Sequence, residues 1–237
     1  IRPLHSQLMT RASYEAQQRE QPDNRPYLIS RCAAPGTQRY AQTWTGDNFT
    51  SWDTLRWNIP MGLGLSLSGF YNVGHDVGGF AGPRPDPELF LRWVQNGIFH
   101  PRFTIHSWND DGTANEAWMY PEITPLVRDA LKLRAQLIPY LYTLLHQAVT
   151  EGEPMLRPLF LDHADDPNCK TAEFDFLLGR DLLVATVVEP GAETRRVTLP
   201  ANPDGWWAFD GSAWHPGGEM LEVPVTDETI PLFVRGG

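Results

Sequence analysis

Apolar and polar positions in the first half of the chain fall into two alternating patterns: short apolar runs, and longer segments with a period of three to four residues. The periodic segments predict helices, and the short runs predict buried strands. Helices are expected over residues 4–21, 51–63 and 88–97, strands over 25–30, 40–44 and 98–105, an apolar run over 63–71 and a glycine-rich turn over 74–80. Strands that alternate with helices are typical of a parallel α/β sheet, and these units amount to about half of a β/α barrel.

A longer periodic segment follows at residues 121–150. Its apolar stripe recurs every three or four residues and consists of Leu126, Ala130, Leu133, Leu137, Leu141, Leu144 and Ala148. This spacing predicts a helix with one buried face. Pro139 lacks the N–H that a helix interior needs, so we expect it to kink the helix or split it in two. Gly152 is expected to end the helix.

Beyond residue 173 the pattern changes to short apolar strands separated by turns rich in Gly, Pro, Asn and Asp. The expected strands are residues 174–178, 182–188, 195–199, 206–210, 222–225 and 229–234. Short strands at intervals of roughly ten residues are typical of an antiparallel β-sandwich. We therefore expect a domain boundary between residues 154 and 167.

Composition narrows the function classes. The chain has 19 Lys and Arg against 29 Asp and Glu, a net charge of −10, and no block of five basic residues, which argues against nucleic acid as a partner. No apolar stretch reaches the ~20 residues that a membrane span needs. His75, His100 and His106 match no zinc spacing, so no metal is expected. Cys32 and Cys169 are expected to be free thiols.

The residues Trp44-Thr45-Gly46-Asp47-Asn48 follow a predicted strand and carry the sharpest chemical signal. Glycosidic bond cleavage needs an acid that protonates the leaving oxygen and a second carboxylate opposite it. Desolvation beside a large aromatic ring lets a carboxyl group hold its proton near neutrality. Asp47, close to Trp44, has that arrangement in principle. Taken alone, however, an Asp before a helix is more often a helix cap.

Further motifs extend along nearly the whole chain in a fixed order. They are Arg31; Gln38-Arg39-Tyr40; Trp44-x-Gly46-Asp47-Asn48; Ser68-Gly69; Gly74-x-Asp76-x-Gly78-Gly79-Phe80; Arg92-Trp93; His106; Trp118-x-Tyr120; Pro139-Tyr140-Leu141-Tyr142; and the segments 178–185 and 230–235. In order and spacing this series resembles glycoside hydrolase family 31, which includes α-glucosidases and α-xylosidases. A Gly-Asp-Asn triplet alone would be weak evidence, whereas the ordered series is strong.

The resemblance implies the fold class α/β plus all-β. Residues 1–155 would be the C-terminal half of a (β/α)8 TIM barrel, strands 5–8, and residues 165–237 a proximal antiparallel β-sandwich. The implied activity is hydrolysis of non-reducing-end α-glycosidic bonds with retention, on an oligosaccharide or α-glycoside and without a cofactor. An α-transglycosidase with the same residues, a non-catalytic carbohydrate-binding relative and a purely structural subunit are alternatives. The sequence does not indicate which sugar or which linkage is cleaved, and it leaves the localisation unknown.

The resemblance also implies roles for individual residues. Asp47 matches the general acid/base, Arg31 an arginine that contacts hydroxyls of the cleaved sugar, and Trp44 an aromatic wall of that subsite. His106 matches a histidine that hydrogen-bonds sugar hydroxyls, and Asp76 matches a buried aspartate that is mainly architectural. These five residues form the predicted site.

Four of these residues also have a purely structural interpretation. Arg31 could pair with a surface acid, His106 could be a core histidine, and Trp44 could simply fill the core. For Asp76 the structural interpretation is favoured, because an Asp flanked by glycines often bonds the backbone amides of its own turn.

One position departs from the family pattern. Many relatives carry an Arg two residues before the histidine, whereas this chain has Thr104. The polar loop that follows, residues 107–116, should border the sugar site and is expected to influence substrate choice. Its acidic residues lack the EF-hand spacing, so we expect a solvated loop rather than a Ca²⁺ site.

The family's catalytic nucleophile, an aspartate at the end of an earlier barrel strand, has no match in this chain; Asp23 lies in a turn before a strand instead. We therefore expect a longer polypeptide whose N-terminal half supplies that residue. Half a barrel would also leave a parallel sheet edge open. The 237 residues alone are predicted to be inactive, and measurable turnover of an aryl α-glycoside by this chain alone would refute that.

Overall fold

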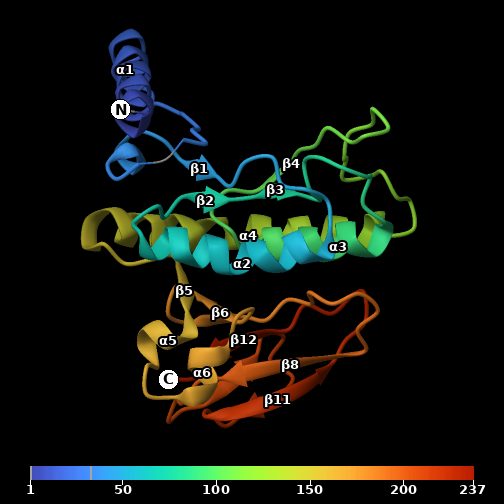
Figure 1. The fold of residues 1–237 in the computed structure, drawn as a ribbon. Helices are drawn as coiled ribbons and strands as arrows, with labels where there is room; N and C mark the ends of the chain where they lie inside the picture. The colour runs from blue at the N-terminus through green and yellow to red at the C-terminus, as the bar shows by residue number, and fades with distance from the viewer. Residues whose placement is uncertain (1, 33) are drawn as a thin grey trace.

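The computed structural model describes residues 2–32 and 34–237. Short parallel strands lie over a layer of helices, and antiparallel sheets lie beneath those helices (Figure 1). The first helix, α1 (Arg2–Glu20), projects from the rest of the fold and buries only Thr10. It confirms the helix predicted over residues 4–21. A short 3-10 helix, η1 (Thr37–Arg39), follows.

Four short parallel strands form the upper layer. They are β1 (Thr43–Trp44), β2 (Val73–Gly74), β3 (Asp76–Val77) and β4 (Thr104–Ile105), paired as β1–β2 and β3–β4. The glycine-rich segment predicted as a turn over residues 74–80 therefore contains strand structure. The strand predicted over 25–30 reduces to one parallel bridge between Ile29 and Gln42. Pro26 has no N–H to offer a ladder there, and Tyr27 stays 68% exposed.

Of the strand predicted over residues 98–105, only the last two residues, Thr104 and Ile105, form a strand. The backbone N–H groups of Ile98, Phe99 and His100 donate to carbonyls of the preceding helix, so they are not available to a sheet. Ladder hydrogen bonding begins at Arg102, whose N–H donates to Val73 O at 3.1 Å.

Helix α2 (Trp52–Leu67) begins after Ser51, whose Oγ accepts from Thr54 N at 3.1 Å. It runs four residues past the predicted end, so the apolar run expected over 63–71 is largely its last turn. Helix α3 (Pro87–Gly97) begins after Asp86, whose carboxylate accepts from Leu89 N at 2.9 Å. Both starts follow ordinary capping rules, because a side-chain oxygen satisfies a free N–H of the first turn.

Helix α4 (Thr124–Glu151) is one unbroken helix, so the predicted split at Pro139 is wrong. Pro139 has no N–H to donate to the carbonyl of Ala135. Both residues are exposed, so the unpaired carbonyl lies on the solvent-facing side of the helix. The predicted apolar stripe does face the core, through buried Ala130, Leu137, Leu141, Leu144 and Ala148, with Leu126 and Leu133 packed beside them. Gly152 ends the helix in the left-handed conformation, φ 78°, as expected.

The C-terminal part forms an antiparallel six-stranded sheet in the order β10-β9-β12-β7-β6-β5, and a separate pair β11–β8. The bounds are β5 (Leu156–Pro158), β6 (Phe176–Leu178), β7 (Leu182–Val184), β8 (Thr194–Leu199), β9 (Trp206–Ala208), β10 (Trp214–His215), β11 (Glu219–Pro224) and β12 (Leu232–Arg235), with short helices α5 (Leu159–Asp162) and α6 (Pro167–Thr171). Figure 1 shows α5 and α6 beside the sheets.

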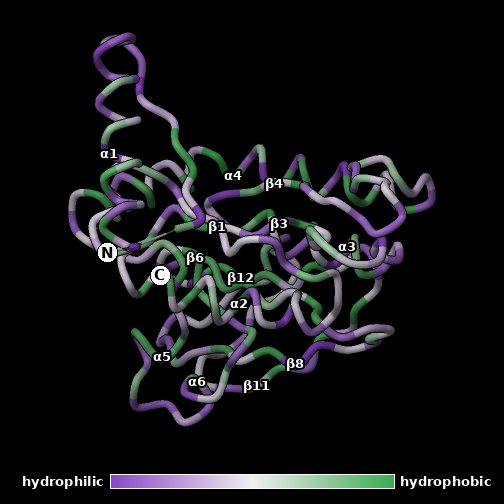
Figure 2. The backbone as a smooth tube through the Cα atoms, turned by 45° about the horizontal axis from the view of Figure 1, so that its top comes forward, coloured by the Kyte–Doolittle hydropathy of each residue, from purple (hydrophilic) through white to green (hydrophobic). Residues whose placement is uncertain are grey.

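The six-stranded sheet is a middle layer with two buried faces. Leu177 and Leu183 join the cluster that contains residues of β8. Their neighbours Leu178 and Val184 join the larger cluster with α2, α3 and α4. Successive strand side chains point to opposite faces, so one pair of strands binds both neighbouring layers. Figure 2 shows apolar segments gathered around α2, β6 and β12, whereas α1 is mostly polar.

Polar side chains of α3 fasten the helix layer to the sheets. Arg92, 1% exposed, donates to the backbone carbonyls of Thr226 (3.1 Å) and Thr229 (3.3 Å). Asn96 Nδ2 donates to Thr186 Oγ1 at 2.8 Å. Buried charge requires such partners, so these bonds fix how the two parts meet.

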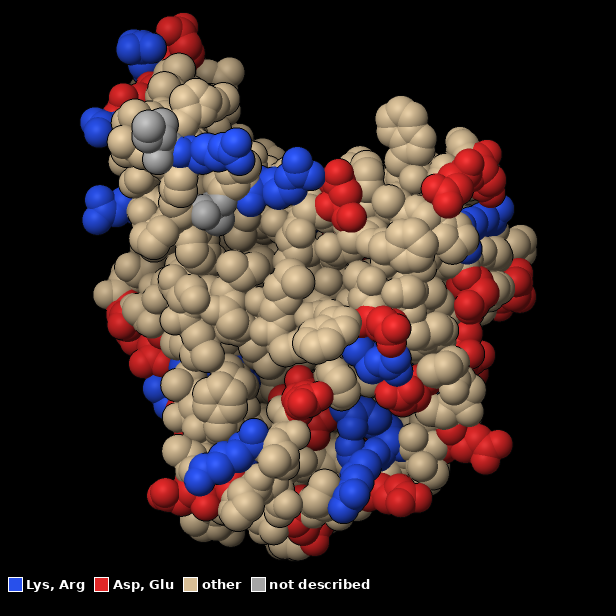
Figure 3. Space-filling view, viewed as in Figure 1, with Lys and Arg blue, Asp and Glu red and all other residues tan. Residues whose placement is uncertain are grey.

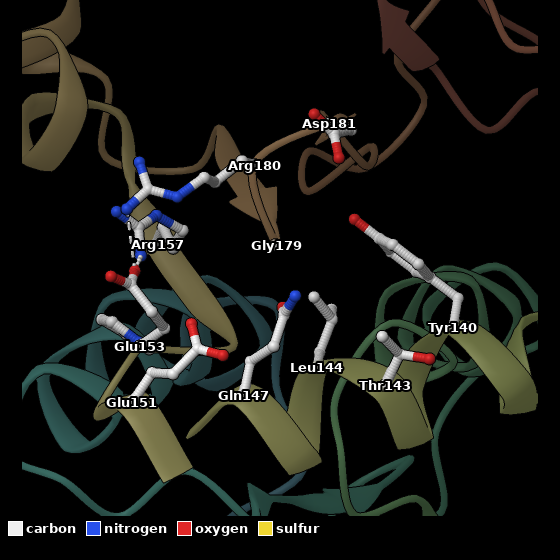
Figure 4. A pocket seen from close by; sticks show the side chains of 11 residues that line it. Tyr140, Thr143, Leu144, Gln147, Glu151, Glu153, Arg157, Gly179, Arg180 and Asp181 are labelled. Carbon is white, nitrogen blue, oxygen red and sulfur yellow. Dashed lines mark hydrogen bonds and ion pairs between the residues drawn. The ribbon is translucent and has the colours of Figure 1, made fainter. Parts of the chain in front are cut away.

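A polar hollow of about 390 Å³ lies where the end of α4 meets β5 and β6 (Figure 4). Arg157, 4% exposed, pairs there with Glu153 (2.7 Å) and Asp162 (2.6 Å), and Arg180 pairs with the same two carboxylates. Tyr140 Oη donates to the backbone carbonyl of residue 178 at 2.7 Å. The network ties the helix end to the sheet.

Both charge signs are interspersed on the face shown in Figure 3, without a continuous basic patch. Cys169 is buried and Cys32 exposed, and neither forms a disulfide within the described residues. Across residues 2–32 and 34–237, no helix combines the length and apolarity needed to cross a membrane.

Replacement of Leu183 by Ala should lower the free energy of unfolding by about 2–5 kcal/mol, because this side chain is fully buried between the sheets. Urea unfolding measures the loss. Met220→Ala in β11, where the side chain is 41% exposed, is the control and should cost less than about 1 kcal/mol. Equal, small losses for both variants would contradict the middle-layer arrangement.

Candidate active site

Asp47 lies in the loop that follows β1, and the backbone on both sides of it is fixed by neighbouring segments. Thr45 N donates to Gly74 O at 3.3 Å, which continues the β1–β2 ladder. Asn48 O accepts from Phe80 N at 2.7 Å. The loop is therefore held between β2 and the segment after β3.

The Asp47 carboxylate pairs with Arg31 rather than with a helix. Arg31 Nη1 lies 3.1 Å from Asp47 Oδ2. Because Ser51 caps α2, the interpretation of Asp47 as its cap is wrong. Gly46 has a φ of 89°, and a Cβ there would come within 2.9 Å of Arg31 Cδ. Glycine therefore permits both the turn and the close approach of the arginine.

The Arg31–Asp47 pair is open to solvent, with side chains 56% and 49% exposed. A pair of this kind contributes about 0–1 kcal/mol. The sequence suggested that Asp47 would be dehydrated beside Trp44, and this chain does not provide that dehydration. The half-buried Trp44 ring instead faces the Arg102 guanidinium, 5.6 Å from the ring centroid. Trp44 is therefore not plain core.

Asp76, in β3, lies beneath this surface and is fully buried. Its carboxylate makes no hydrogen bond within the described residues, so the interpretation as a turn aspartate bonded to backbone amides is wrong. Arg102 Nη1 lies 3.6 Å from Asp76 Oδ1. Burial raises the pKa of Asp76 to about 6, against the opposing positive charges of Arg102 and His106; the charge of Asp47 raises it further.

His106 follows β4 and is exposed, so it is not a core histidine. Its ring centroid lies 5.1 Å from that of Phe80, with the two planes tilted by 47°. Phe80 N in turn donates to Asn48 O, next to Asp47, so His106 and Asp47 both adjoin the segment that contains Phe80. The predicted residues are thus gathered at one rim.

The strand register explains this gathering. Trp44 lies opposite Gly74 in the β1–β2 pair, and Asp76 lies opposite Thr104 in the β3–β4 pair. Parallel strands in register end on the same side, where barrel active sites are built. A Cβ on Gly74 would overlap the carbonyl oxygen of Arg102, so glycine is required where the chain segments meet.

Arg102 is the residue at this site that the sequence analysis missed. It lies in the bend just before β4, two residues before Thr104, and supplies a cation 3.6 Å from the Asp76 carboxylate. The missing arginine at Thr104 was therefore a usable signal to look for another cation nearby.

The loop over residues 107–116 lies beside this rim. Trp108 N donates to Phe80 O at 2.7 Å, and the Trp108 side chain is 74% exposed. Asn109 and Asn115 are buried, and Asn115 Nδ2 donates to Gly79 O at 3.1 Å. The expected solvated loop thus has a buried amide core. Within the described part of the chain, no three His, Cys, Asp or Glu side chains are grouped to hold a metal ion.

Two family models match consecutive parts of this chain. The glycosyl hydrolases family 31 TIM-barrel domain matches residues 1–144. The chain belongs to glycosyl hydrolase family 31. The family 31 C-terminal domain matches residues 152–237.

Family 31 proteins of known name share much of the sequence. Neutral alpha-glucosidase AB of Homo sapiens is 41% identical over 214 residues, which cover 90% of this chain and 22% of that protein. A probable glucan 1,3-alpha-glucosidase of Arabidopsis thaliana is 39% identical over 220 residues, 92% of this chain and 24% of that protein. The chain thus spans about a quarter of the length of these relatives.

Solved family 31 structures share the fold. A Tris-bound glucosidase II alpha subunit has a TM-score of 0.91 at 30% identity and covers 99% of this chain and 26% of its own. A Flavobacterium johnsoniae GH31 dextranase complexed with glucose has a TM-score of 0.89 at 31% identity, over 96% of this chain and 29% of its own. The predicted fold class, part of a TIM barrel followed by an antiparallel β domain, is confirmed.

Asp76→Asn should flatten the pH dependence of stability. The folded pKa of about 6 exceeds the ordinary 3.8, so the stabilisation from the neutral form is complete below about pH 3.8 and lost as pH rises through about 6. About two pKa units correspond to roughly 3 kcal/mol. Urea unfolding at about pH 4 and 7.5 measures this difference. Between these two pH values, the free energy of unfolding should fall by up to ~3 kcal/mol less in the variant than in the parent. Parallel pH curves would contradict the raised pKa.

Proposed function

We propose that the polypeptide containing this chain hydrolyses α-glycosidic bonds at non-reducing ends with retention, and that Asp47 is its general acid/base. The observation that carries this proposal is the position of Asp47: at the carboxyl end of a barrel strand, exposed, paired with Arg31 at 3.1 Å and held by fixed backbone on both sides. Membership of family 31 supports the reaction class.

In this mechanism protonated Asp47 gives its proton to the departing glycosidic oxygen, while a second carboxylate attacks the anomeric carbon. Asp47, then ionised, takes a proton from water as the water releases the sugar. Retention of this kind requires the two carboxyl groups to be about 5–5.5 Å apart. Asp76 is fully buried, so it is not placed to attack a sugar. We infer that the nucleophile comes from a part of the polypeptide outside this chain.

The neighbouring residues fit a sugar subsite. We assign to Arg31 and His106 hydrogen bonds with sugar hydroxyls, since both side chains are exposed at the rim. Trp44, half-buried, would form an apolar wall, and Asp76 with Arg102 would hold the floor. The exposed Trp108 beside Phe80 is the candidate in the 107–116 loop for contact with the next sugar. The substrate class is an oligosaccharide or α-glycoside; relatives include α-glucosidases and a dextranase.

Asp47→Ala in the complete enzyme should abolish hydrolysis of maltose-like substrates, because their poor leaving groups depend on protonation. General acid catalysis contributes about 10²–10⁴-fold, so at least a hundredfold loss of kcat/KM is expected. Asp53→Ala removes another exposed, Arg-paired aspartate, on α2, and should keep near-parental activity. Near-normal turnover of maltose by the Asp47 variant would defeat the assignment.

A further inference from the structure

The two residues that flank Gly46 and Asp47 are joined by a chain of side-chain hydrogen bonds. Asn48 Nδ2 donates to Thr45 Oγ1 at 2.9 Å and to Asn58 Oδ1 of α2 at 3.0 Å. Thr45 Oγ1 lies 3.0 Å from His75 Nδ1, in the link between β2 and β3. The loop is therefore closed across its base and tied to both a helix and the strand layer.

Both anchors of this chain are buried. Asn58 is 1% exposed and His75 is 3% exposed. The His75 ring packs edge-on against His100, with centroids 4.7 Å apart. The α2 backbone closes the other side, since a Cβ on Gly62 would lie 3.3 Å from His75 Nε2. Neither anchor has room to shift, because close-packed interiors leave few voids.

The Thr45 hydroxyl can donate to His75 Nδ1 only when the imidazole is neutral with its proton on Nε2. Burial lowers the pKa of His75 well below its ordinary value; positive charge on His100 and Arg102 lowers it further, and a backbone bond with Asn58 opposes the shift. A neutral imidazole has one nitrogen free to accept. Thr45 Oγ1 already accepts from Asn48, so its own proton is available to His75 Nδ1.

Within residues 2–32 and 34–237, the side chain of Asp47 has no comparable support. Its partner is Arg31, in a solvent-exposed pair worth about 0–1 kcal/mol. The position of the carboxylate must therefore come from the loop that carries it. That loop contains Gly46 at positive φ, the residue type that restricts a backbone least.

We propose that Thr45 and Asn48 are positioning residues for Asp47: their bonds to His75 and Asn58 hold the acid/base loop where the carboxyl group reaches the glycosidic oxygen. The inference rests on the proposed function of Asp47. A general acid must lie within hydrogen-bond reach of the atom it protonates, and a misplacement of about 1 Å can cost about a hundredfold in rate.

The test compares Thr45→Val, which keeps shape but removes the hydroxyl, with Thr45→Ser, which keeps the hydroxyl. Both are made in the complete enzyme and assayed for kcat/KM on maltose and on an aryl α-glucoside with an activated leaving group. Thr45→Val should lose about 10–100-fold on maltose and less than about threefold on the aryl substrate. Thr45→Ser should restore the maltose value to within about threefold. Thr186→Val removes a fully buried hydroxyl that bonds Asn96 rather than the Asp47 loop, and it is the matched control, with both substrates near parental.

The ratio between the two substrates decides the outcome. Equal losses on both, or no loss on maltose, would overturn the inference, because a general packing defect does not select against poor leaving groups. If Thr45→Val does not fold, Asn48→Ala tests the same ratio of losses on the two substrates. If Asp47→Ala retains maltose turnover, the proposed function itself fails. If Asp47→Ala is inactive while the Thr45 and Asn48 variants show no substrate selectivity, only this inference fails.

Discussion

The register between the short parallel strands is the constraint on which the candidate site depends. It places Asp76 opposite Thr104 and brings Arg102, in the bend before β4, within 3.6 Å of the buried carboxylate. A slip by one residue would turn the guanidinium to the other face and leave a buried charge without a partner. Gly74, in β2 just before β3, permits this close approach, because any side chain there would collide with the Arg102 carbonyl. The exposed edge that carries Asp47, Arg31 and His106 forms only when the parallel strands end at the same level.

The helix layer beneath the site is held in place by the six-stranded sheet, which packs against two hydrophobic clusters. Leu178 packs toward the helices and Leu177 toward β8, so the same strand is buried on both sides. Arg92 adds direct bonds from α3 to the backbone of the β domain. Movement of the helices would therefore expose apolar surface on one side and leave a buried guanidinium unpaired on the other, which costs several kcal/mol by either route.

Features fixed by local chemistry were predictable from the sequence: the starts of α2 and α3, the stripe of α4 and its stop at Gly152. Features set by distant partners were not. Asp47 precedes a helix and resembles a cap, but Ser51 stands directly before the first turn and takes that role. The glycines around Asp76 suggested a self-bonded turn, whereas its partner is a cation from another strand. The predicted strand lengths were wrong for the same reason, because a strand extends only as far as a neighbouring strand pairs with it. The gathering of Asp47 with Arg31 was foreseeable only through the family resemblance.

The two carboxyl groups of the site differ in environment in a way that suits the proposed chemistry. Burial raises the pKa of Asp76 to about 6, while Asp47 stands at the rim with half of its side chain in water. The exposed Arg31 pair is also weak, and a sugar can displace water from Asp47 without first breaking a strong bond. On this mechanism the bound substrate completes the dehydration of the acid, and the loop anchors ensure that the carboxyl group is in place when that happens.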